Sequence, residues 1–447
     1  MQVTEWAAGP VKPLFYPTPH ISHSPERMVK TIRGGWHWPA KMFCYKKPIE
    51  DLPRPERLSL PLWRGGKASV FPGDWVHACD IIGYDQQGLP VYAPLAGQVE
   101  QVENFNDLAA RPKGYDVARL TVHLQVSQAQ HPPEAVLEPR PRYWEMTRRE
   151  LGGRIWEAGI RDLQEPPDLD LLVFNGLDLE PPLSVRTRLL AEQPEKLIEG
   201  MRILMQLHGS GRARLALSAD LPELAERMRV LLTSSVNLSV VEMPPRYPQG
   251  HPRLLKEAFP EHPRSGVYGL EEVWNVRQAV MEGRPLTDKL CTVWDQTSGQ
   301  TNVLRLPLGI TAEQVFRRDL SRYRSVKLIM GGLLSGRGVF SPQTPVGPEC
   351  DGLILMKDEV AWEGSLCANC GECVNLCPRG LSPQLIYRAV EAGDKAALEV
   401  YRAGGCIECG LCSFVCPARL HLLHQIKTGK ALLNGAPVPG QTVLDTP

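Results

Sequence analysis

Two near-copies of one cysteine motif decide the fold of the C-terminal part: CANCGECVNLCP at residues 367–378 and CIECGLCSFVCP at residues 406–417. Each reads CxxCxxCxxxCP, and together they hold eight of the chain's 12 cysteines. Two-residue spacers let one loop present three thiolates to the corners of an iron–sulfur cubane, while backbone N–H groups face the cluster's negative charge. The pattern therefore predicts two [4Fe-4S] clusters.

The fourth cysteine of each motif is followed by proline, and in two-cluster ferredoxins the cysteine at this position ligates the other cluster. The predicted ligands are Cys367, Cys370, Cys373 and Cys416 for the first cluster, and Cys406, Cys409, Cys412 and Cys377 for the second. Between the motifs, Ser382 and Pro383 begin a predicted helix and Asp394 caps another. Such a helical hairpin would bring the two loops together, as reciprocal ligation requires.

The alternative interpretation is a pair of zinc sites, each with four cysteines. Zinc motifs usually come as separated CxxC pairs, rather than as three cysteines within seven residues followed by CP. Two cubanes held close together pass electrons by tunnelling, and the motifs leave no evident open ligand position for a substrate. The segment is therefore interpreted as an electron relay.

The rest of the composition limits the function classes. A chain of 447 residues predicts two to four domains. Lys+Arg and Asp+Glu both number 50, so no net field points to nucleic acid or anionic lipid. No apolar run approaches the roughly 18 residues that span a bilayer, and the N-terminus has no export signal. Four scattered cysteines are expected to be buried apolar residues: Cys44, Cys79, Cys291 and Cys350.

Two patterns precede the cysteine motifs. Short β segments separated by turns, from residue 57 onward, are typical of a lipoyl-type barrel-sandwich; its hairpin turn at 84–88 has no lysine, so a carrier role is not expected. From 170 to 243 strands alternate with helices, one of them with Asp220 as its predicted N-cap, which favours a parallel sheet. Because ligands bind beyond the carboxyl ends of such strands, FNGLDLEPP at 174–182 marks a possible site.

Several short motifs occur in a fixed order along the chain. They are GGWHWP (34–39), PGDWV (72–76), LPVYAPLAGQV (89–99), EAGI (157–160), FNGLDLEP (174–181), YPQG (247–250), VWNV (273–276), IMGG (329–332) and the two cysteine motifs. In this order the chain resembles the C subunit of the Rnf electron-transport complex over nearly its whole length.

The resemblance implies a multidomain α/β plus β protein. Its expected parts are an extended N-terminal segment (1–56), a lipoyl-like barrel-sandwich domain (57–125), a linker (126–145), an α/β domain like the flavoprotein of complex I (146–284), a β-grasp unit of SLBB type (285–345), a helical two-cluster ferredoxin domain (360–432) and a tail (433–447).

The resemblance also implies a function and a possible flavin site. In the family, NADH reduces bound FMN, and electrons pass through the clusters to membrane partners; FMN-binding positions would be Asn175, Gly176, Glu180 and Tyr247. The family's glycine-rich phosphate loop follows AGI, but residues 161–170 read RDLQEPPDLD, which is acidic and contains no glycine. Phosphate-binding loops need glycine because their backbone N–H groups must approach closely. We therefore expect the FMN and NADH sites to be weakened or absent.

The sequence thus predicts an iron–sulfur electron-transfer subunit of an Rnf-type complex, which relays electrons between partner proteins and does not bind nucleic acid. NADH dehydrogenase activity of its own is left open, since its flavin and NADH sites are expected to be weakened or absent. The expected location is the cytoplasm, peripheral to the inner face of the cytoplasmic membrane through partner subunits. The alternative is an NADH-oxidising FMN flavoprotein subunit with a rearranged site near Asn175, Glu180 and Tyr247.

Overall fold

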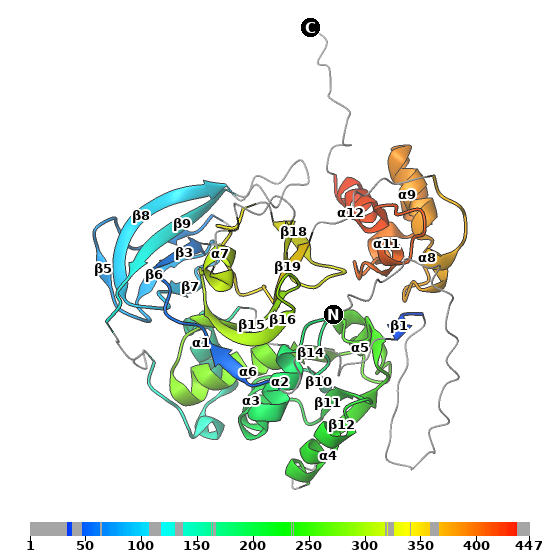
Figure 1. Cartoon of the computed structure of the whole chain (residues 1–447). Helices are drawn as coiled ribbons and strands as arrows, with labels where there is room; N and C mark the ends of the chain where they lie inside the picture. The colour runs from blue at the N-terminus through cyan, green and yellow to red at the C-terminus, as the bar shows by residue number, and fades with distance from the viewer. Residues whose placement is uncertain are drawn as a thin grey trace, which may run out of the picture.

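The computed structural model of the chain, drawn in Figure 1, has four folded parts. It describes residues 34–37, 47–62, 65–106, 118–129, 137–161, 163, 167–233, 235, 237–317, 320, 326–339, 341–357 and 366–435. Cys44 and, within RDLQEPPDLD, residues 162 and 164–166 lie outside the described residues.

The first part is the predicted barrel-sandwich. Alternate residues of its edge strand, Leu58, Leu60 and Leu62, are buried, as one-sided strands require. One sheet has the order β3 (Arg57–Leu62), β9 (Ala118–Val126), β8 (Gly97–Asn106) and β5 (Trp75–Val76). The other has the order β4 (Lys67–Ala68), β6 (Ile81–Tyr84) and β7 (Pro90–Tyr92).

The second part is the predicted α/β domain with a parallel sheet. Its strand order is β12 (Leu238–Met243), β11 (Ala213–Ser218), β10 (Leu171–Asn175) and β14 (Ser265–Gly269), and all neighbours are parallel. The helices around it are α1 (Arg148–Glu157), α2 (Val185–Glu192), α3 (Pro194–Leu207), α4 (Pro222–Leu231), α5 (Pro252–Glu257) and α6 (Leu270–Arg277), with a π turn, η4, at Gln278–Glu282.

β10 is buried along its whole length because the sheet is covered on both faces. The predicted N-cap of α4 is wrong: Leu221 occupies that position. The Asp220 carboxylate instead accepts a hydrogen bond from the Ser218 hydroxyl at 2.5 Å. A short 3-10 turn, η3 (Tyr143–Glu145), lies in the predicted linker.

The third part is a six-stranded sheet with one short helix, α7 (Ala312–Phe316). The strand order is β18 (Arg337–Val339), β17 (Val326–Met330), β19 (Gly352–Lys357), β15 (Asp288–Asp295), β16 (Gln300–Pro307) and β2 (Ile49–Asp51). β2 and β19 lie outside the predicted range 285–345, so the sheet uses chain from both sides of it. Its core is continuous with that of the barrel-sandwich.

The fourth part is the helical ferredoxin domain, orange to red in Figure 1. Its helices are α8 (Glu372–Asn375), α9 (Pro383–Glu391), α10 (Lys395–Val400), α11 (Leu411–Phe414) and α12 (Leu422–Leu433), with a 3-10 turn, η6, at Ala403–Gly405. α9 packs mainly on α12. Asp394 caps α10 as predicted, accepting from the Ala397 N–H at 2.9 Å, whereas Ser382 holds the N-cap position of α9 without a side-chain bond.

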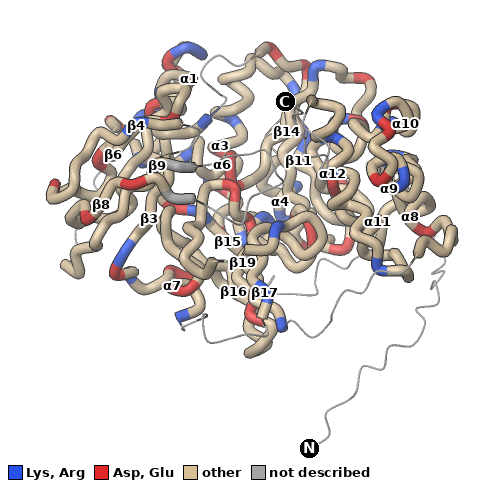
Figure 2. Tube along the Cα trace, turned by 90° about the horizontal axis from the view of Figure 1, so that it is seen from above, with Lys and Arg blue, Asp and Glu red and all other residues tan. Residues whose placement is uncertain are grey.

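A short N-terminal strand joins two of these parts. β1 (Trp36–His37) pairs with β13 (Arg246–Tyr247) of the α/β domain, and its Trp36 ring meets Phe414 of the ferredoxin domain edge-on at 5.8 Å. Viewed from above, Lys/Arg and Asp/Glu positions are interspersed along the described chain (Figure 2), in keeping with their equal numbers in the sequence. In the described part of the chain, no helix has both the length and the apolar character needed to cross a bilayer.

Candidate functional site

The structure gathers the eight motif cysteines around two cavities. Cys367, Cys370, Cys373 and Cys416 line the first, which we name the first cluster site. Cys377, Cys406, Cys409 and Cys412 line the other, the second cluster site. Each cavity thus takes three cysteines from one motif and the fourth from the other motif, in the grouping that reciprocal ligation would need.

Local backbone geometry explains how each loop wraps a cavity. Residues at matching positions adopt left-handed conformations: φ is +52° at Asn369 and +80° at Gly371, and +59° at Glu408 and +77° at Gly410. Glycine tolerates such turns without strain. Backbone N–H groups also face the sulfur atoms, as Glu408 N–H does toward Cys406 Sγ at 3.3 Å. These donors would stabilise a negatively charged cluster.

The thiols themselves are strongly affected by burial. Burial raises the pKa of the Cys409 thiol to about 12, and it also raises the pKa of Cys373, Cys406 and Cys412. Without a metal the thiols of Cys406, Cys409 and Cys412 are therefore neutral. Iron would have to displace their protons on binding, which couples assembly of the site to pH.

The cysteine geometry bears on the choice between a cluster and a single ion. Within the described ranges, no three His, Cys, Asp or Glu side chains come close enough together to hold one metal ion. Each four-cysteine set instead surrounds a cavity. An all-thiolate set around a cavity fits a cubane, whose corners bind one cysteine each.

The two cluster sites differ in their surroundings. At the first, Cys370 is exposed and the neighbouring Leu366 has 94% of its surface exposed. The second is covered by other parts of the chain. The Tyr247 hydroxyl donates to the Cys409 carbonyl at 2.6 Å, and the Gly35 N–H donates to the Leu376 carbonyl at 3.1 Å.

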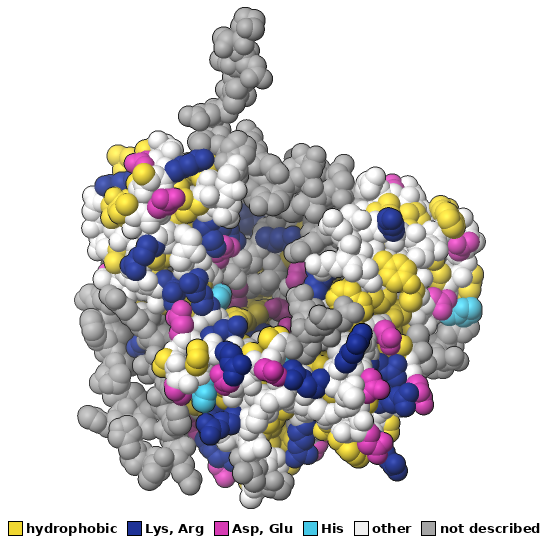
Figure 3. All heavy atoms as spheres, turned by 180° about the vertical axis from the view of Figure 1, so that it is seen from behind, with side chains coloured by type: hydrophobic (Ala, Val, Ile, Leu, Met, Phe, Trp, Pro, Cys, Tyr) yellow, Lys and Arg dark blue, Asp and Glu magenta, His cyan; other side chains and the backbone are white. Residues whose placement is uncertain are grey.

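A central cavity of about 800 Å³ lies where three parts of the chain meet. It opens beyond the carboxyl ends of β10 and β14, and Cys409 of the second cluster site forms part of its wall. Figure 3 shows the surface hollowed between the domains, with acidic and basic side chains in the hollow. FNGLDLEPP contributes Asn175 and Glu180 to the lining, so the position expected for a ligand is indeed next to a cavity.

The polar side chains predicted to bind FMN make hydrogen bonds to other residues of the protein. The Asn175 amide donates to the Gly250 carbonyl at 2.7 Å and accepts from the Leu177 N–H at 3.2 Å. The Tyr247 hydroxyl donates a hydrogen bond to the Cys409 carbonyl. Gly176 packs so closely on β11 that a Cβ there would lie 2.6 Å from the Leu217 side chain.

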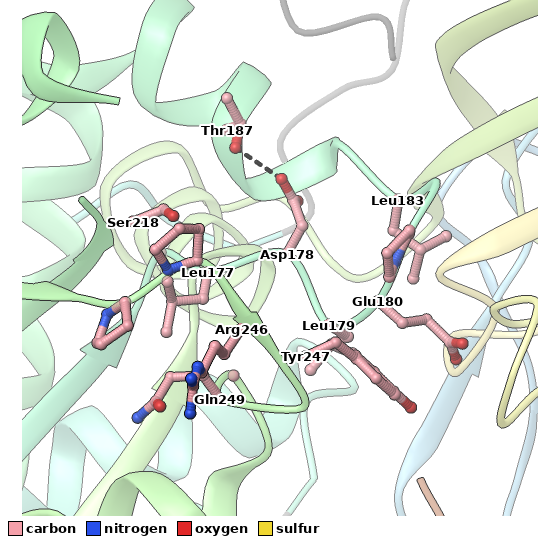
Figure 4. A pocket seen from close by; sticks show the side chains of 15 residues that line it. Leu177, Asp178, Leu179, Glu180, Leu183, Thr187, Ser218, Arg246, Tyr247 and Gln249 are labelled. Atoms are coloured by element: carbon pink, nitrogen blue, oxygen red, sulfur yellow. Dashed lines mark hydrogen bonds between the residues drawn. The ribbon is translucent and has the colours of Figure 1, made fainter. Parts of the chain in front are cut away.

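Glu180, the fourth of these residues, fills a glycine loop, which we define as residues 331–336. Its carboxylate accepts from the Leu334 N–H at 2.7 Å and from the Ser335 hydroxyl at 2.5 Å. A Cβ on Gly332 would lie 1.7 Å from the Glu180 carboxyl carbon. Figure 4 shows this side chain reaching toward the loop. The sequence did not indicate this contact, although a backbone N–H cradle beside a cavity is a general anion site.

The charges of the central cavity do not fit the phosphate of FMN either. Three cations that line it are already paired with acids: Arg186 with Glu271 at 2.8 Å, Lys289 with Asp351 at 2.6 Å, and Lys427 with Glu408 at 3.7 Å. The lining contains six acidic side chains and four Lys or Arg. Burial raises the pKa of Glu180, as expected for a carboxyl taken out of water. The described lining therefore does not fit FMN.

A smaller pocket is lined by most of the segment 176–183 (Figure 4). There the Asp178 carboxylate accepts from the Thr187 hydroxyl at 2.6 Å and from the Arg186 N–H at 2.9 Å, at the start of α2. Burial raises the pKa of Asp178 to about 7. These bonds anchor the segment that carries Glu180.

Three known domain families match successive segments of the chain. Residues 30–118 match the RnfC barrel sandwich hybrid domain, residues 149–266 the Nuo51 FMN-binding domain, and residues 366–421 the 4Fe-4S dicluster domain. Their order agrees with the fold, and confirms the barrel-sandwich, the complex I flavoprotein-like domain and the C-terminal iron–sulfur domain predicted from the sequence.

Relatives with similarity over most of the chain have related names. The C subunit of the proton-translocating ferredoxin:NAD(+) oxidoreductase complex of Clostridium ljungdahlii is 25% identical over 395 residues, which cover 80% of this chain and 84% of that protein. The C subunit of the ion-translocating oxidoreductase complex of Pasteurella multocida is 25% identical over 432 residues. The alignment covers 90% of this chain but 51% of that protein, so this chain spans about half its length.

A solved structure, the NAD+-reducing [NiFe]-hydrogenase in the H2-reduced state, is 16% identical, with a TM-score of 0.44 and coverage of 70% of each chain. This similarity is too low to support a conclusion.

Fold and site together define a modular iron–sulfur protein built on a flavoprotein-like scaffold. The resemblance stated from the sequence is confirmed: over most of its length the chain is similar to the C subunits of ion-translocating oxidoreductase complexes, and residues 30–118 match the RnfC barrel sandwich hybrid domain.

Proposed function

We propose that this chain is an iron–sulfur electron-transfer subunit of an Rnf-type oxidoreductase complex, which holds two [4Fe-4S] clusters. The observation that carries the proposal is the pairing of two cavities with four cysteines each, drawn from both motifs. Each cluster would accept one electron and pass it on without making or breaking a bond. The cysteines supply charge and fixed geometry for this transfer.

The surroundings of the two cluster sites suggest a direction of electron flow between them. The second cluster site shares Cys409 with the central cavity, and its loop contacts the α/β domain. The first cluster site exposes Cys370. We assign the second site as the one that receives electrons at the domain junction and the first as the one that delivers them to a partner protein, because tunnelling falls steeply with distance.

Partners would be the other subunits of such a complex. The relatives named above belong to multisubunit complexes, and the described helices provide no membrane span. We therefore propose a location on the cytoplasmic side of the membrane, held there by partner subunits.

The absence of a bound flavin is part of this proposal. It is supported by the occupied glycine loop, the paired cations and the acidic excess in the central cavity. One observation favours the alternative of an NADH-oxidising flavoprotein subunit: residues 149–266 match the Nuo51 FMN-binding domain. The two functions differ in flavin content.

Anaerobic purification of the full chain would test the proposal. Expected are about eight iron and eight acid-labile sulfide per chain, two reducible clusters by electron paramagnetic resonance, and no flavin in an acid extract. Stoichiometric FMN with NADH-dependent reduction of an artificial acceptor would favour the alternative. A colourless protein with zinc and without iron would overturn both.

A further inference from the structure

Tyr247 links the α/β domain directly to the second cluster site. It lies on β13, which pairs with β1, and only 7% of its surface is exposed. Its hydroxyl donates to the backbone carbonyl of Cys409 at 2.6 Å. Since Cys409 is a predicted ligand of the second cluster, a residue of another domain contacts the peptide of a ligand.

The hydrogen bond between the Tyr247 hydroxyl and the Cys409 carbonyl is buried, so its loss should have a measurable effect. A tyrosine hydroxyl is protonated at neutral pH, so Tyr247 is a donor to this carbonyl. A buried hydroxyl that lost its acceptor would retain an uncompensated desolvation cost. The Cys409 carbonyl is therefore held by a donor whose dipole has its positive end toward that carbonyl, in the peptide of a predicted ligand of the second cluster.

A second contact presses on the same loop. Glu180 holds the glycine loop through the Leu334 and Ser335 N–H groups. Gly410 of the second cysteine loop packs against this glycine loop, since a Cβ on Gly410 would lie 2.1 Å from the Leu334 carbonyl oxygen. At Gly371, the matching residue of the first loop, a Cβ would meet no atom within 4 Å. The other domains thus contact the second cysteine loop at this position and not the first.

We propose that Tyr247 is a positioning residue that raises the reduction potential of the second cluster relative to the first. The inference rests on the proposed two-cluster function. A reduced cluster carries one more negative charge. The Tyr247 O–H group offsets the negative end of the Cys409 carbonyl dipole beside the site, which stabilises the reduced form. One electron enters from a one-electron reductant, no bond breaks, and the phenol keeps its proton. The second site would then attract electrons to the domain junction.

The test is a potentiometric titration of the anaerobic full chain with dithionite, followed by electron paramagnetic resonance, for Tyr247→Phe. The expected result is a fall in one midpoint potential. The fall should correspond to a change of about three- to tenfold in the equilibrium constant for reduction, and a tenfold change is 59 mV for a one-electron couple. The other potential is expected not to move. Repeating the substitution in Cys416→Ser, which should retain only the second cluster, would show which cluster shifts.

Tyr92→Phe is the matched control, because the Tyr92 hydroxyl of the barrel-sandwich also donates to a backbone carbonyl, that of Glu157, which belongs to neither cluster site. It should leave both potentials unchanged. If Tyr247→Phe does not fold, Glu180→Gln provides a second variant, for which a smaller shift of the same potential is expected. Unchanged potentials in a folded variant with both clusters would overturn this inference and leave the proposed function intact. A wild-type chain without clusters would instead overturn the proposed function.

Discussion

The two cysteine loops have nearly the same local structure and very different surroundings. Gly371 and Gly410 occupy matching positions with φ of +80° and +77°. Yet Cys370 is exposed to solvent, whereas the Cys409 carbonyl accepts a hydrogen bond from the Tyr247 hydroxyl. The comparison teaches that a repeated motif determines the shape of each cysteine loop, while the contacts made by neighbouring domains distinguish the roles of the two sites.

The largest effect should come from the cysteines shared between the loops. Cys377→Ser and Cys416→Ser should each remove one cluster and about half of the iron, because each site needs four thiolates. Pairing substitutions tests reciprocal ligation: Cys377→Ser with Cys409→Ser should retain about half of the iron, while Cys377→Ser with Cys370→Ser should retain almost none. Iron analysis of anaerobic protein is the measurement.

Cys79→Ser, outside both motifs, is the control and should keep all of its iron. The reverse pattern in the two double variants would show that each loop provides all four ligands of its own cluster.

The free energy of unfolding is expected to depend on pH through Asp178, in the segment whose Glu180 holds the glycine loop against the second cysteine loop. Asp178 anchors the segment that carries Glu180, and burial raises its pKa to about 7. The folded state therefore binds this proton more tightly than the unfolded state. The free energy of unfolding should fall as pH rises from about 4 to 7, by at most about 4 kcal/mol relative to Asp178→Asn. Denaturant unfolding of both proteins across this range measures the difference.

Asp170→Asn is the opposite control, because Arg264 lowers the pKa of Asp170. The advantage of wild type over that variant should grow as pH rises through the acidic range. A wild-type minus Asp178→Asn difference that stays constant from pH 4 to 7 would contradict the assignment.

Matched glycine substitutions probe the two loops directly. Gly371→Ala and Gly410→Ala both force alanine into a left-handed conformation, which costs each about 1–2 kcal/mol. Only the second adds a clash, with the Leu334 carbonyl. Gly410→Ala should therefore lose about 1–3 kcal/mol more of the free energy of unfolding than Gly371→Ala. Equal losses would mean that the glycine loop does not press on the second loop.

The smallest effect concerns Arg379, which pairs with Glu257 of the α/β domain; the residue that follows the second motif at the matching position is Ala418. Arg379→Ala should cost about 0.2–1 kcal/mol, because both side chains are partly exposed and salt screens them. A double-mutant cycle with Glu257→Gln, monitored by thermal unfolding at low and high salt, isolates the pair. A coupling that does not weaken in salt would contradict an ion-pair contribution.

Local patterns allowed much of the fold to be predicted. Proline placement located the start of α9, and alternating strands and helices indicated the parallel sheet. These features depend on residues close in sequence. The prediction at Asp220 failed because its carboxylate bonds to Ser218 instead of capping the helix, a choice between two local partners that propensity does not decide.

Contacts between distant segments were not predictable in the same way. Nothing in the sequence indicated that β2 would complete the sheet of β16, or that Glu180 would fill a loop about 150 residues away. Tyr247 was expected near a flavin, and its hydroxyl instead meets the Cys409 carbonyl. Such pairings depend on how domains pack, and neither partner carries a local signal for the other.

The sequence by itself determined the cysteine loops, the order of the domains and the acidic stretch where a phosphate loop would stand, because spacing and residue type act over a few residues. Only the tertiary structure decided which loop faces the central cavity and which faces solvent. The two motifs are alike within themselves, so the distinction had to come from the packing of other domains against one of them.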